Sequence, residues 1–508
     1  MAECFVKGIE RINLTIKDTA DIQKVEMKDD VTKVQISKTD ISGKELPGAK
    51  LTILDKDGKV VESWTSEEKA HYIEMLPIGE YTLREETAPD GYLVAEEFPV
   101  KDFDAGHTWA TARELTMSVI LPSADSYEVY MLTGNPAVST TRLLQHVKLN
   151  GANRQSVNVS CPTVLSELWI AIVDAAGEVK EARIAVGTNE VNITADLSSA
   201  NSRGSTPAVL AGVSPQPYTF CFEDAFPKPG DYDFNDLVMG VQLNKRYAAN
   251  TTDPDTLIIS TNLKAVGTVN PIGAAMRLKG VNTAVVGTTY EAEDTYPYYK
   301  YGSSFVPTTE DRKFIEKTSE VNPTNRDVCI PLFCDAHYAI SKGSMDNAQQ
   351  VVRCYYNTMT DEDMAEVATT GKLGMKVGTV KREFRVLFHQ SSRASFNDFN
   401  MMDLDLFAVT SYNGGYFETH TMTYKADEVI HQYINGANQE VYSKNYIWAL
   451  LVATDFRYAR EGKVIGTLGA NGYDGAYCTP SHSFFDWGRD RYNARDWYLY
   501  PDNTNTYR

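Results

Sequence analysis

Phe222-Glu-Asp-Ala-Phe-Pro-Lys-Pro-Gly-Asp-Tyr-Asp-Phe-Asn-Asp-Leu-Val238 is a stretch in which carboxylates crowd in front of an apolar run. Five carboxylates fall within fourteen residues, and an amide lies among the last of them: Glu223, Asp224, Asp231, Asp233, Asn235 and Asp236. Proline and glycine at 227, 229 and 230 predict a turn. The acidic side chains would therefore lie on a loop that leads into a strand at Leu237-Val-Met-Gly-Val241.

This density of carboxylates has two explanations, a bound cation or an acidic turn in contact with solvent. Neighbouring carboxylates repel one another unless a cation neutralises them, and a flexible cage of oxygen ligands favours Ca²⁺ over Mg²⁺. The loop is not an EF-hand, because its sixth position would be Asp236 instead of Gly and its twelfth Gln242 instead of Glu. We predict Ca²⁺ with the ligands Asp231, Asp233, Asn235 and Asp236, and with Glu223 or Asp224 as further ligands.

Aromatic motifs recur after this loop, at Tyr446-Ile-Trp-Ala449, Phe456-Arg-Tyr458, Phe485-Asp-Trp487 and Arg495-Asp-Trp-Tyr498. Together with the loop, they make residues 103–508 resemble the LruC-type domain of surface proteins from Bacteroidetes and other bacteria. The likeness departs from the family pattern around residues 397–427. The resemblance implies a surface location and metal binding, and it implies no reaction.

The first hundred residues alternate short apolar runs with Gly and Pro turns, which predicts a small β-sandwich. The predicted strands include Val34-Gln-Ile-Ser-Lys-Thr39, Lys50-Leu-Thr-Ile-Leu54 and Tyr81-Thr-Leu-Arg-Glu85. Through Ile36-Ser-Lys-Thr-Asp40 and Glu85-Glu-Thr-Ala-Pro-Asp-Gly-Tyr92, residues 31–102 resemble a CnaB-type domain of Gram-positive adhesins. Residues 12–30 resemble the closing strands of a preceding copy.

The CnaB resemblance implies isopeptide chemistry, with Lys38 as the nucleophile, Glu85 as the catalytic carboxyl and Asp29 as the acceptor. Burial in an apolar core favours the uncharged amine and carboxyl that such a reaction needs. Asp29 precedes Lys38, however, and a parallel crossover between neighbouring strands needs about a dozen residues. We therefore expect Asp29 to serve a neighbouring copy by strand donation, or to stay unreacted.

The fold class that we predict is mainly β, built from several β-sandwiches with a few short helices. Four segments are expected: 1–30 as strands that end a CnaB-type repeat, 31–102 as a CnaB-type sandwich, 103–245 as a sandwich that carries the acidic loop, and 246–508 as a LruC-like region with aromatic loops. Strands are predicted at 115–120, 127–131, 168–173 and 191–194, and short helices at 311–319 and 361–368.

Charge and composition exclude several kinds of partner. The net charge of −19 and the pI near 5.0 argue against nucleic acid and anionic membranes. No stretch approaches the roughly 18 apolar residues of a membrane span. The N-terminus has no secretory signal, so we expect that one was removed or that the chain is a fragment. The seven cysteines form no zinc motif, although Cys329 and Cys334 are close enough in sequence to pair in an oxidising compartment.

The eight histidines and the serines form no familiar catalytic motif. Asp403 and Asp405 could in principle serve a glycosidase, and residues 397–400 ahead of them form either a second cation loop or a solvated turn. A glycan-binding surface is an alternative for the aromatic residues Trp487, Trp497 and Tyr498 with Arg495, since rings stack on sugars. The same residues would equally suit the edge of a core.

These observations favour a non-enzymatic, calcium-stabilised protein of the cell surface with a structural or adhesive role. Its partners would be an extracellular glycan or protein, or neighbouring copies through strand donation. The alternative is a carbohydrate-active enzyme or glycan-binding protein that uses the C-terminal half. A third explanation is that the N-terminal module was exchanged or fused, because its resemblance points to a different bacterial lineage.

Overall fold

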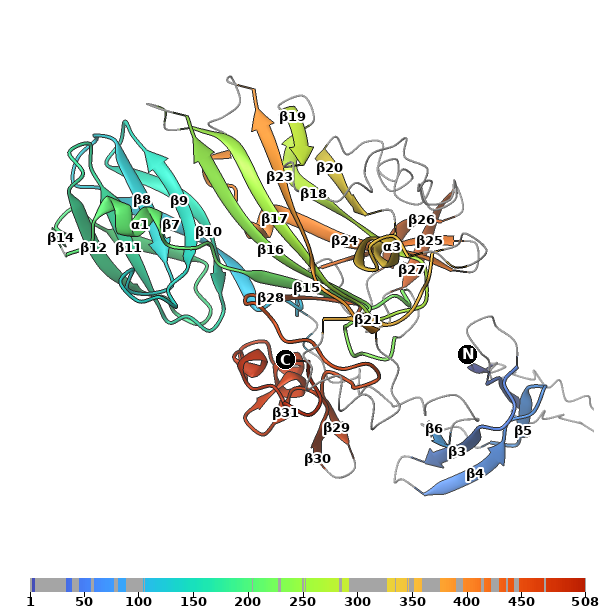
Figure 1. Ribbon diagram of the computed structural model, residues 1–508. Helices are drawn as coiled ribbons and strands as arrows, with labels where there is room; N and C mark the ends of the chain where they lie inside the picture. Colours follow the sequence, from blue (N-terminus) through green and yellow to red (C-terminus); the bar gives the residue numbers. More distant parts are fainter. Residues whose placement is uncertain are drawn as a thin grey trace, which may run out of the picture. The chain divides into compact units, whose positions relative to one another are not determined.

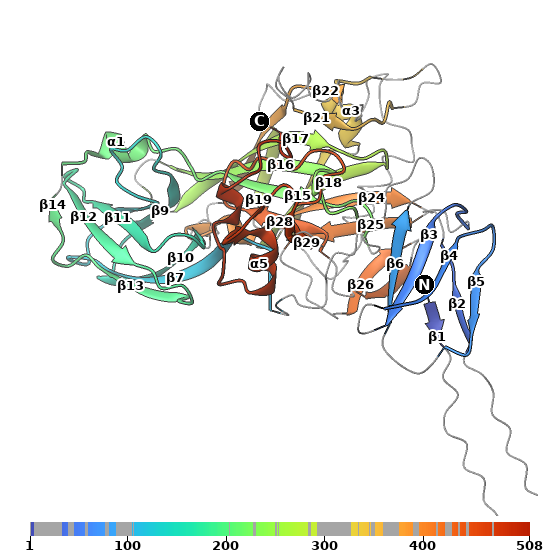
Figure 2. The ribbon, with the colours of Figure 1, turned by 90° about the horizontal axis from the view of Figure 1, so that it is seen from below.

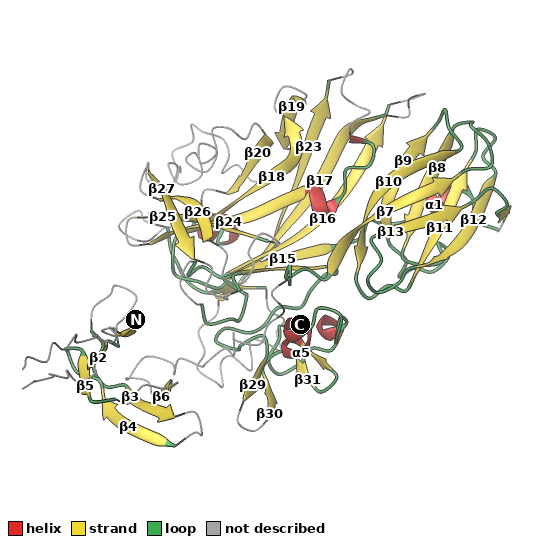
Figure 3. Cartoon of the chain, turned by 180° about the vertical axis from the view of Figure 1, so that it is seen from behind, coloured by secondary structure: helices red, strands yellow, loops and turns green. Residues whose placement is uncertain are grey.

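The computed structural model divides the chain into two compact units, Met1–Phe98 and Pro99–Arg508. It describes residues 2–4, 33–38, 45–55, 59–76, 81–87, 104, 106–202, 204–226, 230–248, 251, 253–282, 286–291, 327–333, 335–344, 346, 351–358, 375–389, 396–412, 415–421, 429–434, 437–442, 447–469 and 472–507. Strands dominate both units (Figure 3), which confirms the prediction of a mainly β, multidomain chain. Among the described residues, no helix has the length and apolar character that crossing a bilayer requires.

The N-terminal unit consists of two three-stranded sheets, whose strands are blue in Figure 2. One sheet has the order β1-β2-β5, formed by Ala2–Cys4, Lys33–Ile36 and His71–Glu74, and the other has the order β4-β3-β6, formed by Val60–Thr65, Lys50–Asp55 and Tyr81–Thr87. Val34 and Ile36 are buried on either side of the exposed Gln35, the period-two alternation of a half-buried strand. With Ile53 and Ile73 they form a small core.

Two sheets of the larger unit pack face to face as the sandwich predicted after residue 103 (Figure 1). The first sheet has the order β10-β7-β13, formed by Arg154–Pro162, Ala112–Ile120 and Asn192–Asp196. The second has the order β14-β12-β11-β8-β9, formed by Asn201–Ser202, Val179–Ala185, Glu167–Val173, Tyr127–Leu132 and Leu143–Leu149. Apolar residues that alternate along β7, such as Leu115, Met117 and Val119, are fully buried between them.

A second pair of sheets follows a short helix, α1 (Pro207–Ala211). The larger sheet has the path β19-β23-β17-β16-β15-β28, formed by Val286–Glu291, Val380–Phe388, Pro254–Val266, Leu237–Tyr247, Tyr218–Phe222 and Ala449–Val452, with β21 (Tyr356–Asn357) and β22 (Met375–Lys376) beside β17. The smaller sheet is β20-β18-β24-β25, formed by Asp327–Phe333, Ile272–Asn282, Leu404–Tyr412 and Gly415–His420. Their facing side chains form the largest core, which includes Phe220, Met239 and Met276.

Strand β16 corrects the segment boundary that we placed between residues 245 and 246. It runs through that point and pairs with β17 along its length. Splitting it would leave buried backbone donors and acceptors without partners, which proteins avoid. The acidic loop between β15 and β16 therefore belongs to the second pair of sheets and not to the sandwich of residues 112–202.

The remaining described elements are hairpins and short helices. They are β26 (Val429–Ile434), β27 (Ala437–Tyr442), β29 (Thr467–Gly469), β30 (Gly472–Asp474), β31 (Cys478–Thr479), β32 (His482–Ser483), α3 (Ala336–Ile340), α5 (Phe484–Arg489), η5 (Met401–Asp403) and η6 (Trp497–Leu499). The helices predicted at 311–319 and 361–368, the segment 12–30 with Asp29, and Cys334 lie outside the described residues.

Candidate metal centre

The acidic loop is anchored at both ends by neighbouring strands of the larger sheet. Phe222 at the end of β15 pairs with Leu237 at the start of β16, and β28 pairs with the other edge of β15. Residues 223–236 therefore form the connection of an antiparallel hairpin whose strands are fixed on both sides. This confirms the strand that we predicted at 237–241 after the loop.

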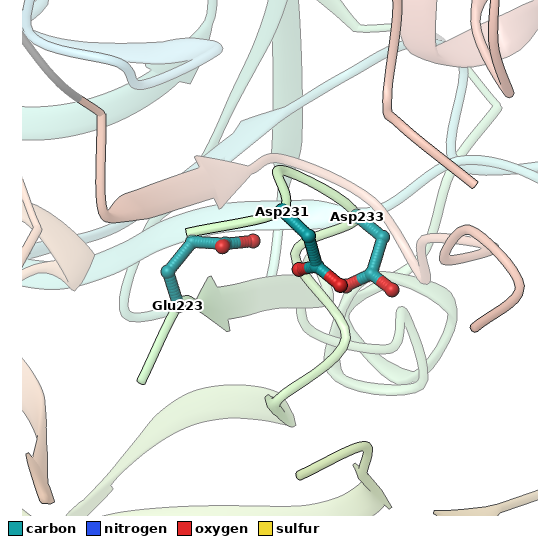
Figure 4. A group of neighbouring side chains, drawn as sticks. All are labelled: Glu223, Asp231 and Asp233. Atoms are coloured by element: carbon teal, nitrogen blue, oxygen red, sulfur yellow. The ribbon is translucent and has the colours of Figure 1, made fainter. Parts of the chain in front are cut away.

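Three carboxylates of the loop converge on one point (Figure 4). One oxygen from each of Glu223, Asp231 and Asp233 lies within 4.8 Å of the other two. Glu223 and Asp233 are buried, with 0% and 2% of their surfaces exposed, whereas Asp231 is exposed. The group thus has one side open to solvent, from which an ion could enter.

Backbone donors hold the two buried carboxylates in place. Phe234 N donates to Glu223 Oε1 at 2.7 Å, and Tyr232 N donates to Glu223 Oε2 at 3.1 Å. Asp233 Oδ2 accepts from Asn235 Nδ2 at 2.8 Å and from Gly462 N at 2.9 Å. Since a carboxylate offers about four lone-pair sites, these bonds orient the groups and leave acceptor capacity for a cation.

The carboxylates destabilise one another's charged forms. Burial, and then the charge of Asp231, raise the pKa of Glu223 and of Asp233 well above their usual range. Burial, and then Asp224, raise the pKa of Asp236 in the same direction. A cation at this position would reverse the effect, because an opposite charge favours ionised carboxylates.

The backbone of the loop is strained where it presents these groups. Tyr232 and Phe234, on either side of Asp233, have φ angles of 60° and 52°, in the left-handed region that large L-residues rarely adopt. Both side chains are buried, at 5% and 0% exposure, which holds the turn in this conformation. A Cβ at Gly230 would collide with Glu223 Oε2, so any larger residue here would displace that carboxylate from its backbone donors. Strain of this kind is typical of ligand-binding turns.

Asn235, which we predicted as a ligand, has one unsatisfied side-chain atom. Its side chain is fully buried, and its Oδ1 has no hydrogen-bond partner among the residues that the structure describes. Leaving a buried acceptor unsatisfied costs about 1–3 kcal/mol. The Nδ2 of Asn235 faces Asp233, whereas its Oδ1 lies against Gly267, so the described group of converging oxygens consists of the three carboxylates.

Two of the predicted ligands are engaged elsewhere in the fold. Asp236 Oδ2 accepts from Asp224 N at 2.7 Å, and Asp224 Oδ2 accepts from Asn270 Nδ2 at 2.8 Å and from Thr268 Oγ1. Neither carboxylate belongs to the converging group of three. In the described structure they tie the loop to the turn after β17.

Sequence reasoning missed the contribution of the segment after β28. Gly462 donates to Asp233, Ile465 N donates to Tyr232 O at 2.7 Å, and the charge of Glu461 helps to raise the pKa of Asp233. These residues are more than 220 positions from the loop, and no local spacing could have indicated them.

The N-terminal unit brings together two of the three residues predicted for isopeptide chemistry. Lys38 Nζ lies 3.2 Å from Glu85 Oε1 and 3.3 Å from Oε2. The Glu85 side chain is 4% exposed and that of Lys38 is 23% exposed. Asp29, the predicted acceptor, lies outside the described residues.

The aromatic residues that we considered for glycan binding are buried, which corrects that alternative. Trp487, Trp497 and Tyr498 are 1%, 0% and 5% exposed. The two tryptophan rings lie 5.5 Å apart within a cluster of rings, and Arg495 donates through Nη1 to the carbonyl of Thr163. Rings that pack on one another cannot stack on a sugar, so the alternative of a core was right at these positions.

Asp403 and Asp405 also have roles in the fold. Asp403 completes the capping box of η5, where its Oδ2 accepts from the backbone N of the N-cap residue Asn400 at 2.9 Å. Asp405 accepts from His420 Nδ1 at 3.0 Å and pairs with Arg277 at 3.1 Å. Asn397 is bonded to Tyr247 and to Lys148, so residues 397–400 are held against the fold and are not a solvated turn.

Comparisons with known proteins find family matches in two separate parts of the chain. Residues 32–111 match SpaA, a prealbumin-like fold domain, which confirms the fold predicted for residues 31–102. Residues 255–469 match DUF4842, a domain of unknown function, and this match does not include the acidic loop. No curated protein matches the chain.

Two solved structures show distant likeness. A protein assigned as a lipoprotein from Bacteroides ovatus is 14% identical, with 75% of this chain and 99% of that one covered and a TM-score of 0.41. The major pilin subunit of Bacillus cereus is 8% identical, with 88% of this chain and 92% of that one covered and a TM-score of 0.16. TM-scores this low do not establish a shared fold.

Proposed function

We propose that this chain is a non-enzymatic structural or adhesive protein of the cell surface, and that Ca²⁺ bound at the acidic loop stabilises its larger unit. The observation that carries the metal site is the convergence of Glu223, Asp231 and Asp233 within 4.8 Å. The prealbumin-like match at residues 32–111 supports the surface role. Assignment of the larger unit as LruC-type rests on the motif at residues 222–238 and is part of the same proposal.

The donor set favours Ca²⁺ over the other common cations. Ca²⁺ takes about six to eight oxygen ligands in irregular geometry, whereas Mg²⁺ demands a near-ideal octahedron and Zn²⁺ prefers nitrogen or sulfur. The three carboxylates supply at least three oxygens, and water would complete the shell at the exposed Asp231. A turn of the Asn235 amide would bring its unpaired Oδ1 into play as a further ligand. Such a site would be structural, because a protein of the cell surface is always exposed to extracellular Ca²⁺ and the site would stay occupied.

Calorimetry and thermal unfolding test the metal proposal. Calcium should bind the wild-type chain and raise the melting temperature of the larger unit. At a hundredfold excess of free calcium over Kd, the gain in the free energy of unfolding should be about 2.7 kcal/mol. Asp233→Ala should abolish the heat of binding and the calcium-induced rise in melting temperature. Glu167→Ala, at the exposed first residue of β11, is the control carboxylate and should bind calcium like wild type. Wild-type protein that neither takes up calcium nor melts differently in chelator would overturn the proposal.

A second function, isopeptide formation in the N-terminal unit, is supported by the pairing of Lys38 with Glu85. The reaction joins Lys38 Nζ to a carboxyl carbon, with loss of one water, while Glu85 relays the proton. Strand β2, which leads to Lys38, lies between β5 and the three-residue strand β1. A strand donated by a neighbouring copy, carrying its own Asp29, would replace β1 at that edge.

Intact-mass spectrometry under denaturing conditions separates the outcomes. A dimer or ladder that resists denaturant, and that is absent in Lys38→Ala and in Glu85→Gln, is the result expected for strand donation. A monomer lighter by one water would instead show a bond within the chain. Unmodified monomer in wild type and variants alike rules out the chemistry and leaves the calcium proposal untouched.

A further inference from the structure

One face of the larger sheet is polar and forms the floor of a groove. Gly240, Asn262 and Lys381 lie side by side on β16, β17 and β23, and Gln242, Ser260 and Glu383 form the next row across the same strands. Residues one position away, such as Ile259 and Phe384, face the core on the other side of the sheet. The period of two along each strand thus separates an apolar face from a hydrogen-bonding face.

Segments from outside the sheet form the walls of this groove. Arg142 comes from the start of β9, Ser214 and Pro217 from the connection into β15, and Asp455 from the residues after β28. The groove is open to solvent along one side, and its volume is about 720 Å³. That volume falls within the range of small-ligand pockets, roughly 300–1,000 Å³.

The groove has local positive charge in a chain whose net charge is −19. Its two carboxylates already have cationic partners, since Glu383 pairs with Arg385 at 2.7 Å and Asp455 pairs with Lys264 at 2.9 Å. Lys381 is exposed, and among the described residues neither it nor Arg142 pairs with a carboxylate. Arg142 donates to the carbonyls of Ser139 and Thr141, which fixes its position at the rim.

The floor offers unused hydrogen-bonding capacity. Asn262 Oδ1 is shielded from bulk water and has no partner among the described residues, so it becomes available to a ligand hydroxyl when the amide turns toward the groove. Gln242 Nε2 donates to Pro215 O at 2.8 Å, which orients its amide. Side-chain amides and hydroxyls in a row match the closely spaced hydroxyls of a sugar chain.

We propose that this groove binds a short segment of an anionic polysaccharide, with sugar carboxylates at Lys381 and Arg142 and sugar hydroxyls on Gln242, Ser260 and Asn262. An extended peptide fits less well, because peptides dock by pairing with a sheet edge or by filling apolar pockets, and this floor offers neither. The site is separate from the acidic loop, and the inference does not depend on bound calcium.

Hyaluronate, which carries a carboxylate on alternate sugars, and neutral dextran are the probes, used with the full-length chain in calcium buffer. Hyaluronate should bind, the affinity should fall as salt is raised, and dextran should bind at least tenfold more weakly. Lys381→Glu should weaken hyaluronate binding about tenfold or more, with an unchanged melting temperature because the side chain is exposed. Asn262→Leu should weaken it without changing its salt dependence.

Lys342→Glu is the matched control, because it makes the same change of charge at an exposed residue outside the groove. An equal loss in the two charge-reversed variants would show attraction by net charge alone and would overturn the proposal. Absence of hyaluronate binding, or equal binding of dextran, would overturn it as well. Asp231→Asn should bind hyaluronate like wild type, so failure of the metal site and failure of the groove give different results.

Discussion

Replacing Asp231 with Asn should change the stability of the larger unit in opposite directions with and without calcium. Asp231 is the neighbouring charge that most raises the pKa of both Glu223 and Asp233. The substitution keeps the shape of the side chain and removes that charge. Without calcium it relieves repulsion, and with calcium it removes a ligand.

The separation of the carboxylates sets the size of the effect. At the 4.8 Å within which the three oxygens lie, two charges repel by about 3.5 kcal/mol at an effective dielectric constant of 20 and by about 0.9 kcal/mol in water. Asp231 is exposed, so the water-like value applies to each of its two pairs. Asp231→Asn should therefore stabilise the metal-free protein by about 1–2 kcal/mol. In saturating calcium the variant should lose about 1.4 kcal/mol of stability for each tenfold loss of calcium affinity.

Urea unfolding followed by tryptophan fluorescence measures both values at mildly alkaline pH, which favours the ionised carboxylates. Five of the six tryptophans lie in Pro99–Arg508, so the signal reports mainly on the larger unit. Glu167→Gln removes one charge from an exposed position on β11 and should leave stability unchanged in both buffers. If Asp231→Asn lowers stability equally in chelator and in calcium, repulsion between the carboxylates does not limit the stability of the metal-free protein, and the reasoning fails.

Three further predictions follow from the same structure. In chelator, the free energy of unfolding should fall as pH rises above the ordinary carboxylate range of about 4–4.5. The reason is that the raised pKa of Glu223 and of Asp233 makes the folded chain bind more protons than the unfolded one. Saturating calcium should remove this pH dependence, which urea unfolding over a pH series measures. Burial lowers the pKa of His420, but Asp405 and Glu418 outweigh burial and raise the pKa to about 9. This histidine should therefore stabilise the fold fully below its unfolded pKa of about 6.5 and lose that contribution as pH rises through 9. NMR titration measures the pKa of His420, and Asp405→Asn should lower it. Trp497→Ala should cost about 3–5 kcal/mol in urea unfolding, because the ring is completely buried, whereas the exposed Tyr492→Ala should cost little.

Local features of this chain were predictable from its sequence. The strands at 50–54, 81–85 and 168–173 follow from alternating or continuous apolar runs between turns, because burial of one or both faces imposes those patterns. The acidic loop could be found because its carboxylates are close in sequence. Which of those carboxylates converge could not, because that depends on the φ angles of Tyr232 and Phe234 and on contacts with residues 461–465.

Other predictions failed where the same sequence pattern is compatible with two different structures. Tryptophan, tyrosine and arginine interleave at 487–498 in a way that suits a sugar platform or a buried cluster, and only the packing of the rings decides between them. The boundary at 245 failed because a strand of eleven residues with a polar end, β16, looks in sequence like a strand followed by a linker. The polar groove was invisible, since its floor combines residues from three strands spread over about 145 positions.

The position of β15 between β16 and β28 has a consequence for the order in which the chain is made. β28 is synthesised more than 220 residues after β15, so on the ribosome the buried, aromatic β15 remains an edge strand with one row of unpaired backbone groups. Such an edge invites pairing with other chains. Gly462, which holds Asp233, emerges later still. The sheet and the metal centre can therefore be completed only after Gly462 has been synthesised, and a truncation before β28 would produce an aggregation-prone fragment and not a smaller folded protein.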